Sequence, residues 1–149
     1  MRAVIQRVTR CTITVEGRPV GSISGGLLVY VGVSQTDGEA DARYIADKTA
    51  GLRIFEDGDG VMNLSAEDVG AEICVVSQFT LYGDTRKGRR PSYSHAAPPE
   101  KATPLYEQVV KLLQARGFRV ATGQFGAHMA VAYVNDGPVT ILVDSDKQI

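Results

Sequence analysis

The fold of this chain is organised around the apolar run Leu27-Leu28-Val29-Tyr30-Val31-Gly32-Val33. The run carries no charged residue and does not alternate between apolar and polar side chains. A strand with one face in water shows that alternation, so an unbroken apolar run indicates a strand covered on both faces. Gly25-Gly26 breaks the chain just before it and separates it from the strand that precedes it.

Strand patterns lie on both sides of this run. Residues 3–8 and 12–15 predict two strands, and residues 19–23 predict a third that returns after a turn at Glu16-Gly17-Arg18. Further strands are predicted at 72–76, 118–121, 129–134 and 139–143. The early hairpins favour mostly antiparallel pairing over repeated β-α-β units.

Two helices complete the predicted elements. The first spans about residues 39–52, with Asp37 as its N-cap. The second begins at Glu100 or Pro104 and runs to Arg116, where Gly117 provides a left-handed cap. Its apolar residues follow helical spacing, at Ala102, Leu105, Tyr106, Val109 and Leu113. The elements predict a single α+β domain over residues 1–149, dominated by its sheet.

The overall composition is that of an ordinary soluble globular protein. The 149 residues are 44% hydrophobic and 22% charged, and the net charge of −1 gives no general attraction to nucleic acid or membrane. Any polyanion would have to bind a local patch. Cys11 and Cys74 lie in apolar stretches and are expected in the core as free thiols. The N-terminus has no long apolar stretch, so we expect no signal peptide, no membrane span and a cytoplasmic protein.

Several common kinds of site are missing from the sequence. His95 and His128 are far apart, and no Cys/His cluster has the spacing of a zinc site. No glycine-rich nucleotide loop and no GxSxG elbow occur. The acidic stretch 56–60 lacks the twelve-residue pattern of a calcium loop and is interpreted as a solvated turn. We therefore predict neither a metal nor a cofactor.

The segment Ser77-Gln78-Phe79-Thr80 carries candidate chemistry, because it places two hydroxyls and an amide directly after the buried strand at 72–76. Backbone N–H groups at such a strand end can point at a developing oxyanion. The alternative is a strand followed by a turn, in which Ser77 and Thr80 only satisfy local hydrogen bonds.

Arg86, Lys87, Arg89 and Arg90 place four positive charges in five residues, around Gly88. Such a loop binds phosphates through its charge and the fork shape of arginine, and the alternative is a solvated charged loop. Tyr93 and His95 follow closely and could stack on a base.

Asn135-Asp136-Gly137-Pro138-Val139-Thr140 lies between two apolar strands, so a hairpin turn is the default interpretation. The alternative is a cis Gly137-Pro138 bond, since the cis state of an X–Pro bond lies only roughly 0.5–1 kcal/mol above trans. It would turn two carbonyls in one direction.

Taken together, these segments resemble the D-aminoacyl-tRNA deacylase family. The resemblance spans nearly the whole chain and rests on six segments in order, at 1–8, 52–55, 62–65, 77–82, 85–91 and 135–140. It implies a mostly antiparallel, barrel-like sheet with two helices, assembled as a homodimer. It also implies a cytoplasmic hydrolase that removes D-amino acids from tRNA, its partner.

The resemblance also implies roles for individual residues. Ser77, Gln78, Phe79 and Thr80 would form the reaction pocket. Gly137 and Pro138 would enter the pocket of the other subunit as a chirality screen that rejects L-aminoacyl substrates, with Arg7 holding them in place. Glycyl-tRNA, which has no side chain to exclude, would also be cleaved. Ala102, Phe125 and Met129 would line the adenosine or aminoacyl pocket, and the four basic residues at 86–90 would bind tRNA.

Two chemical routes and two other functions stay open at this point. Either water attacks with help from the 2′-hydroxyl of the terminal ribose, which we favour, or Thr80 is a covalent nucleophile without a visible base. The chain could instead be a non-catalytic RNA-binding module that uses the basic loop, or an esterase or amidase for small molecules that uses Thr80.

Overall fold

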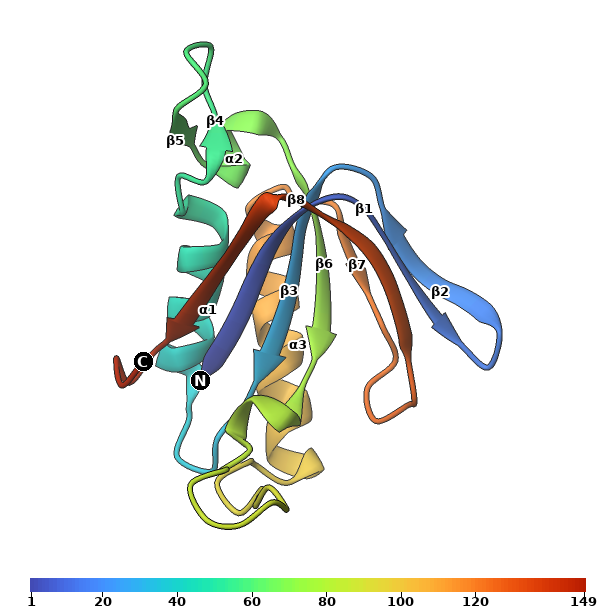
Figure 1. Cartoon of the computed structure of the whole chain (residues 1–149), viewed down its shortest axis with the longest axis vertical. Helices are drawn as coiled ribbons and strands as arrows, with labels where there is room; N and C mark the ends of the chain where they lie inside the picture. Colours follow the sequence, from blue (N-terminus) through green and yellow to red (C-terminus); the bar gives the residue numbers. More distant parts are fainter.

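Strand β3 (Gly26–Gly32) runs through the middle of a six-stranded, strongly curved sheet, as the computed structural model of residues 1–149 shows (Figure 1). Every residue of β3 except Tyr30 is buried, so the prediction of a strand covered on both faces is confirmed. In chain order the elements are β1 (Arg2–Val15), β2 (Arg18–Ile23), β3, α1 (Glu39–Gly51), β4 (Phe55–Glu56), β5 (Met62–Leu64), α2 (Ala66–Val69), β6 (Glu72–Ser77), the 3₁₀ helix η1 (Phe79–Tyr82), α3 (Pro99–Ala115), β7 (Val120–Thr122) and β8 (Ala130–Asp144).

The sheet is barrel-like because its two end strands approach each other. The strand order is β2-β1-β3-β6-β7, and β8 pairs with β1. A Cβ atom added to Gly21 of β2 would lie 2.4 Å from the carbonyl oxygen of Thr122 in β7. Arg119 also donates a hydrogen bond to the carbonyl of Ser22 across the same gap, at 3.2 Å. The barrel-like part of the fold prediction is therefore confirmed.

The expectation of mostly antiparallel pairing is wrong in part, because the sheet is mixed. β1 pairs antiparallel with β2, β3 and β8, whereas β3–β6 and β6–β7 are parallel. The parallel pairs follow from the helices: α1 lies in the connection from β3 to β6, and α3 lies in the connection from β6 to β7. The early hairpins in the sequence describe only the first part of the sheet.

The prediction of two helices is also incomplete, since α2 is a third. It is a single turn, too short to show a helical apolar period. Its signal is a capping box: the Ser65 hydroxyl accepts from the Asp68 N–H at 3.2 Å, and the Asp68 carboxylate accepts from the Ser65 N–H at 2.8 Å. The two longer helices were predicted to within a few residues, and the left-handed conformation of Gly117 is confirmed by its φ of +93°.

Asp37 is not the N-cap of α1, contrary to the prediction. Gly38 takes that position, and its N–H donates to the Asp41 carboxylate at 2.8 Å. Asp37 is buried and accepts instead from the N-terminal amine of Met1 and from the Ser34 N–H, both at 2.6 Å. One partner of Asp37 is the N-terminal amine, 36 residues away in the sequence. A sequence signal for a helix start is local and cannot reveal such a contact.

Two predicted strand pairs are each one long strand. β1 runs without a break through residues 9–11, and β8 continues through 135–140, where a hairpin turn was the default. Both halves of β8 pair with β1, so the chain does not reverse there. Instead Arg7 of β1 stands opposite residues 136–139, which form a bulge, and the Gly137-Pro138 bond is cis as the alternative interpretation expected.

The core lies on both sides of β3. The larger apolar cluster packs Leu27, Val29 and Val31 against the inner faces of α1 and α3. A smaller cluster on the other side surrounds Leu28 and contains Cys11 and Cys74, both buried and free. The prediction for the cysteines is confirmed. No helix of the structure combines the length and the apolar character needed to span a membrane.

We expect Gly26→Ala to destabilise the fold, because Gly26 lies where β3 passes closest to β6. A Cβ atom there would lie 1.9 Å from the Glu72 carbonyl oxygen, a backbone atom that cannot rotate away. Overpacking of this kind costs about 1–3 kcal/mol or more of unfolding free energy. Urea unfolding followed by circular dichroism measures it. Gly51→Ala at the end of α1 is the control, since a Cβ there meets nothing within 4 Å. Equal midpoints for Gly26→Ala and the unchanged protein would contradict this account.

Candidate active site

A cavity of about 580 Å³ opens beside the ends of the parallel strands, next to η1 and the start of α3. It is lined mainly by hydrophobic residues, with Ser77, Gln78 and His128 as polar exceptions. Ser77, Gln78 and Phe79 come from the end of β6 and the start of η1, whereas Ala102 comes from α3 and Phe125 and Met129 from the loop after β7. Three of the four residues expected in a reaction pocket, and all three expected in a substrate pocket, therefore line one cavity.

Backbone hydrogen bonds fix the polar end of this cavity. The Gln78 N–H donates to the Val31 carbonyl of the neighbouring strand at 2.8 Å. The chain then turns into η1, whose first internal bond is donated by Leu81 to the Gln78 carbonyl at 3.3 Å. The N–H groups of Phe79 and Thr80 precede that bond and are the ones a short helix leaves free at its start.

Thr80 lies beside the cavity rather than in its lining. Its hydroxyl accepts a hydrogen bond from the Gln78 side-chain amide, and the residue is exposed. His128 does line the cavity, but no hydrogen bond joins it to Ser77 or Thr80. The structure therefore places no general base in contact with Thr80.

Two aromatic pairs shape the cavity wall. Phe79 and Tyr93 meet edge to face with ring centroids 5.1 Å apart, and both rings are largely exposed, at 56% and 40%. Tyr106 packs against Phe125 at 6.0 Å and donates its hydroxyl to the Val75 carbonyl at 2.9 Å. Burial raises the pKa of Tyr106 well above its usual range, so the phenol stays protonated and keeps that bond. The exposed pair of Phe79 and Tyr93 offers a surface for stacking, and the pair of Tyr106 and Phe125 supports the cavity wall rigidly.

The sequence analysis missed several residues of this cavity. Ala96, Ala97 and Pro99 form part of its wall just before and within the first turn of α3, and His128 is a further lining residue. The consecutive prolines at 98 and 99 are a signal for a helix start, but small residues before a helix carry no chemical signal of their own. Tyr93 had been singled out for stacking and lies at the cavity edge.

Gly137 and Pro138 do not line this cavity. They lie in the bulge of β8, opposite Arg7 of β1. Arg7 is buried beneath them and would lie 3.0 Å from a Cβ on Gly137. Its guanidinium donates to the Ile54 carbonyl at 2.8 Å and pairs with the Asp136 carboxylate at 3.1 Å. The Asn135 amide closes the base of the bulge with bonds of 3.0 Å to the carbonyls of Arg7 and Val139.

The basic residues lie on a hairpin-like loop closed by a bridge between Asp84 and Ser92. Arg86 pairs with Asp84 at 2.6 Å and holds the pKa of that carboxyl far below its usual range. Lys87, Arg89 and Arg90 are exposed and make no salt bridge, so three positive charges face solvent without an acidic partner. We call residues 84–92 the basic hairpin. No group of three or more His, Cys, Asp or Glu side chains is placed to hold a metal ion.

A family model described as D-Tyr-tRNA(Tyr) deacylase matches residues 4–144. The chain belongs to this family. Two similar relatives carry the name D-aminoacyl-tRNA deacylase: one from Thermotoga petrophila, 59% identical over 147 residues that cover 99% of each chain, and one from Heliobacterium modesticaldum, 63% identical over 144 residues that cover 97% of this chain and 96% of the relative.

Two solved structures are also similar to this member of the deacylase family. A protein described as c-Myc DNA Unwinding Element Binding Protein superposes with a TM-score of 0.91 at 39% identity, covering 97% of this chain and 99% of that one. A structure titled as a probable eukaryotic D-amino acid tRNA deacylase gives a TM-score of 0.81 at 20% identity, over 95% and 97% of the two chains. At that identity the second likeness shows a shared fold.

Proposed function

We propose that this chain is a D-aminoacyl-tRNA deacylase, a carboxylic ester hydrolase that releases a D-amino acid from the terminal ribose of tRNA. The observation that carries the proposal is the cavity of about 580 Å³ that joins Ser77–Phe79 to Ala102, Phe125 and Met129 in a member of this family. Its apolar wall suits an adenine ring and an amino-acid side chain, and its polar end suits the ester. Such a protein acts where tRNA is charged, which makes the cytoplasm its proposed location.

The polar end of the cavity supplies the catalytic groups. The N–H groups of Phe79 and Thr80 stabilise the negative charge that develops on the ester carbonyl, an interaction whose loss typically lowers the rate about 100- to 1,000-fold. Water attacks the carbonyl with help from the 2′-hydroxyl of the ribose. Thr80 is a weak nucleophile, because no base contacts its hydroxyl and the amide of Gln78 occupies it.

We expect Thr80→Ala to retain substantial deacylation of D-Tyr-tRNA, and a substrate ending in 2′-deoxyadenosine to lose it. The reason is that the RNA hydroxyl, rather than the threonine, assists the water. Release of labelled tyrosine under single-turnover conditions measures both rates, with L-Tyr-tRNA as the matched control for chirality. Loss of activity in Thr80→Ala together with normal turnover of the 2′-deoxy substrate would instead make Thr80 the nucleophile.

Chirality is selected by a second copy of the chain. Gly137 and Pro138 are exposed and lie outside their own cavity, so they reach a cavity only in a homodimer. Exposed apolar side chains on the same strand, Tyr133, Val134 and Leu142, offer a surface for that contact. Backbone at the apex of the bulge then fills the space that an L-side chain needs, and the L-substrate is rejected by a clash. Glycyl-tRNA escapes rejection and is cleaved, because glycine has no side chain.

We expect Arg7→Ala to lower the ratio of D- to L-Tyr-tRNA turnover by about tenfold or more. Arg7 supports Gly137 from below and joins the bulge to Ile54 and Asp136, so its removal lets the barrier move. Turnover of glycyl-tRNA should change much less than that of the L-substrate. Paired deacylation assays of the three substrates measure these ratios.

Arg10→Ala is the matched control for Arg7, since Arg10 is exposed on the same strand. Thermal melting shows whether each variant is folded, and Arg7→Lys, which keeps the charge without the fork, is the second variant should Arg7→Ala unfold. A folded Arg7 variant with unchanged discrimination, or a protein that sediments as a monomer and still discriminates, would refute the screen.

The basic hairpin holds the tRNA backbone. We expect replacement of Lys87, Arg89 and Arg90 by glutamine to weaken tRNA binding and to reduce the slope of log K against log salt by about two, at roughly 0.7 per phosphate contact. Arg86→Gln is the control and should have the smaller effect, because Asp84 already pairs with Arg86. Filter binding between low and moderate salt gives the slopes. An unchanged slope in the triple variant would place the RNA elsewhere.

The same substrates and variants distinguish two rival functions from the proposed one. A nucleic-acid-binding module would bind tRNA through the basic hairpin and release no D-amino acid. A small-molecule esterase would hydrolyse free D-amino-acid esters as fast as the tRNA-linked ester and would not respond to the hairpin variants.

A further inference from the structure

A second cavity, of about 620 Å³, lies on the other side of η1 from the first. Its lining is the chemical opposite of the first cavity, since only one of its thirteen residues is hydrophobic. Arg2, Arg86 and His95 bring nitrogen groups to it, Gln35 and Gln148 bring amides, and Asp146 brings a carboxylate. None of these residues belongs to the site described above except Arg86 of the basic hairpin.

The two cavities share one thin wall. In the segment before α3, Tyr93 and Ala96 line the first cavity, whereas Ser94 and His95 line the second. η1 is divided in the same way: Phe79 faces the first cavity and Tyr82 the second. A wall one or two chains thick measures on the order of 10 Å. A nucleic acid strand that rises about 3.4 Å or more per nucleotide therefore crosses it within the few nucleotides next to the one in the first cavity.

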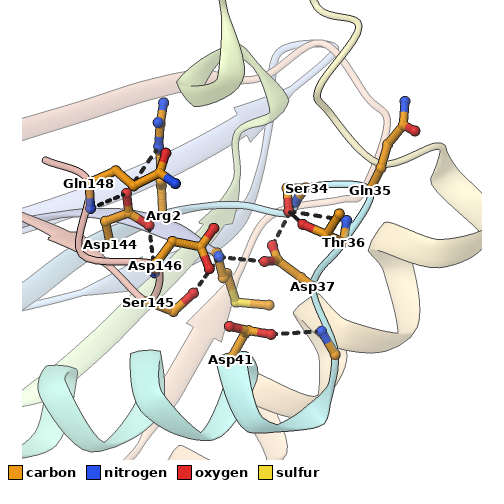
Figure 2. A network of polar contacts seen from close by, with 12 residues as sticks. Arg2, Ser34, Gln35, Thr36, Asp37, Asp41, Asp144, Ser145, Asp146 and Gln148 are labelled. Carbon is orange, nitrogen blue, oxygen red and sulfur yellow. Dashed lines mark hydrogen bonds and ion pairs between the residues drawn. The ribbon is translucent and has the colours of Figure 1, made fainter.

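The floor of the second cavity is built by a polar network that joins the two chain ends (Figure 2). The N-terminal amine of Met1 donates to Asp37 and to the Ser145 hydroxyl, each at 2.6 Å. Asp37 also accepts from the Ser34 N–H at 2.6 Å, which fixes the loop that carries Gln35. Because these groups are buried or half-buried and mutually bonded, the cavity is held in shape before anything enters it.

Arg2 and Tyr82 form a rigid corner of this cavity. Tyr82 is buried at 7% exposure, and the Arg2 guanidinium lies 4.7 Å from the centre of its ring. Arg2 also donates to the Leu81 carbonyl at 3.1 Å and pairs through Nε with the Asp144 carboxylate at 3.7 Å. These contacts fix a positive charge at the cavity wall, where it attracts an anionic or polar ligand.

The lining fits a ribonucleotide. Arginine and histidine donors suit a phosphate or a ribose hydroxyl, and His95 is exposed and can stack on a base. The Asp146 carboxylate is unsuited to a phosphate but accepts from the amino group of cytosine, and the amides of Gln35 and Gln148 suit the remaining edge of such a base. Asp84, the other carboxylate of the lining, is already paired with Arg86.

We infer that the second cavity holds a nucleotide of the tRNA strand just upstream of the aminoacylated adenosine, with a cytidine as the base it fits best. The inference rests on the proposed function, which places that adenosine in the first cavity. The strand then passes over the exposed rings of Phe79 and Tyr93, enters the second cavity and continues along the basic hairpin, which lies next to it through Asp84 and Arg86.

The test compares two substrates, D-Tyr-tRNA and the D-tyrosyl ester of adenosine alone, which lacks every upstream nucleotide. We expect His95→Ala, which loses a stacking contact, and Gln148→Ala, which loses a hydrogen bond to the base, each to raise KM for D-Tyr-tRNA at least about fivefold. The ratio of kcat to KM for the adenosine ester should stay within twofold. His128→Ala lines the first cavity and should impair both substrates. Gln114→Ala, exposed on α3, is the control for Gln148→Ala and should change neither.

Each outcome has one meaning. If the unchanged protein fails to release D-tyrosine from either substrate, the proposed function fails. Suppose instead that the unchanged protein is active. If the His95→Ala and Gln148→Ala variants then keep its KM for D-Tyr-tRNA, or lose activity equally on both substrates, the second cavity does not hold the strand. Competition with uncharged cytidyl-cytidyl-adenosine and with cytidine 5′-monophosphate completes the test. Weaker inhibition of the His95→Ala variant by the trinucleotide supports the inference, whereas inhibition by the mononucleotide alone assigns the cavity to a free nucleotide and overturns it.

Discussion

The pairing of β1 with β8 is the constraint on which the rest of this structure depends. These two longest strands pair antiparallel, from Arg2 opposite Asp144 to Thr14 opposite Ala130. They therefore connect the polar network at the N-terminus with the loop that lies beside the first cavity. Two register shifts interrupt this pairing, between Gln6 and Val8 and between Val8 and Arg10, and at the first of them Arg7 stands opposite residues 136–139. Because a buried guanidinium and the Asn135 amide hold this bulge, an irregular backbone segment keeps a defined shape on an exposed surface. β1 and β8 thus help to shape the first cavity. They also carry the bulge with Gly137 and Pro138, which does not line that cavity in the same chain.

A short segment organises the chemistry at the other end of the sheet. The parallel pairing of β3 and β6 brings their carboxyl ends to one edge, and η1 starts where β6 stops. η1 and residues 93–97 form the wall between the two cavities. Residues next to each other in this wall therefore face different cavities, one apolar and one polar. An apolar cavity suits a base and an amino acid, and a polar one suits a nucleotide unit with its phosphate. The path proposed for the RNA strand follows from their arrangement beside the basic hairpin.

Sequence patterns predicted those parts of the fold in which neighbours along the chain decide the outcome. Three features appear where expected: the buried strand at 27–33, the apolar stripe on α3 and the left-handed glycine after it. The spacing of apolar residues along the chain directly reflects whether one or both faces of an element are buried. The errors have a different origin. Asp37 was assigned to a helix it does not cap because the N-terminal amine, distant in sequence, competes for it. The bulge in β8 was read as a turn by default because turn and bulge use the same residue types, and only the pairing partner distinguishes them.

The buried central strand, the two long helices, the family and the residue types available for chemistry all follow from the order of residues along the chain, because each depends on a local pattern or a motif. Which of these residues meet follows from the folded arrangement alone. The folded chain brings Ser77–Phe79 to Ala102, Phe125 and Met129, puts His95 and His128 in different cavities, and leaves Gly137 and Pro138 outside the first cavity. The physical reason is that these meetings depend on strand register and on the curvature of a mixed sheet, and both are fixed by contacts between segments that are distant in the chain.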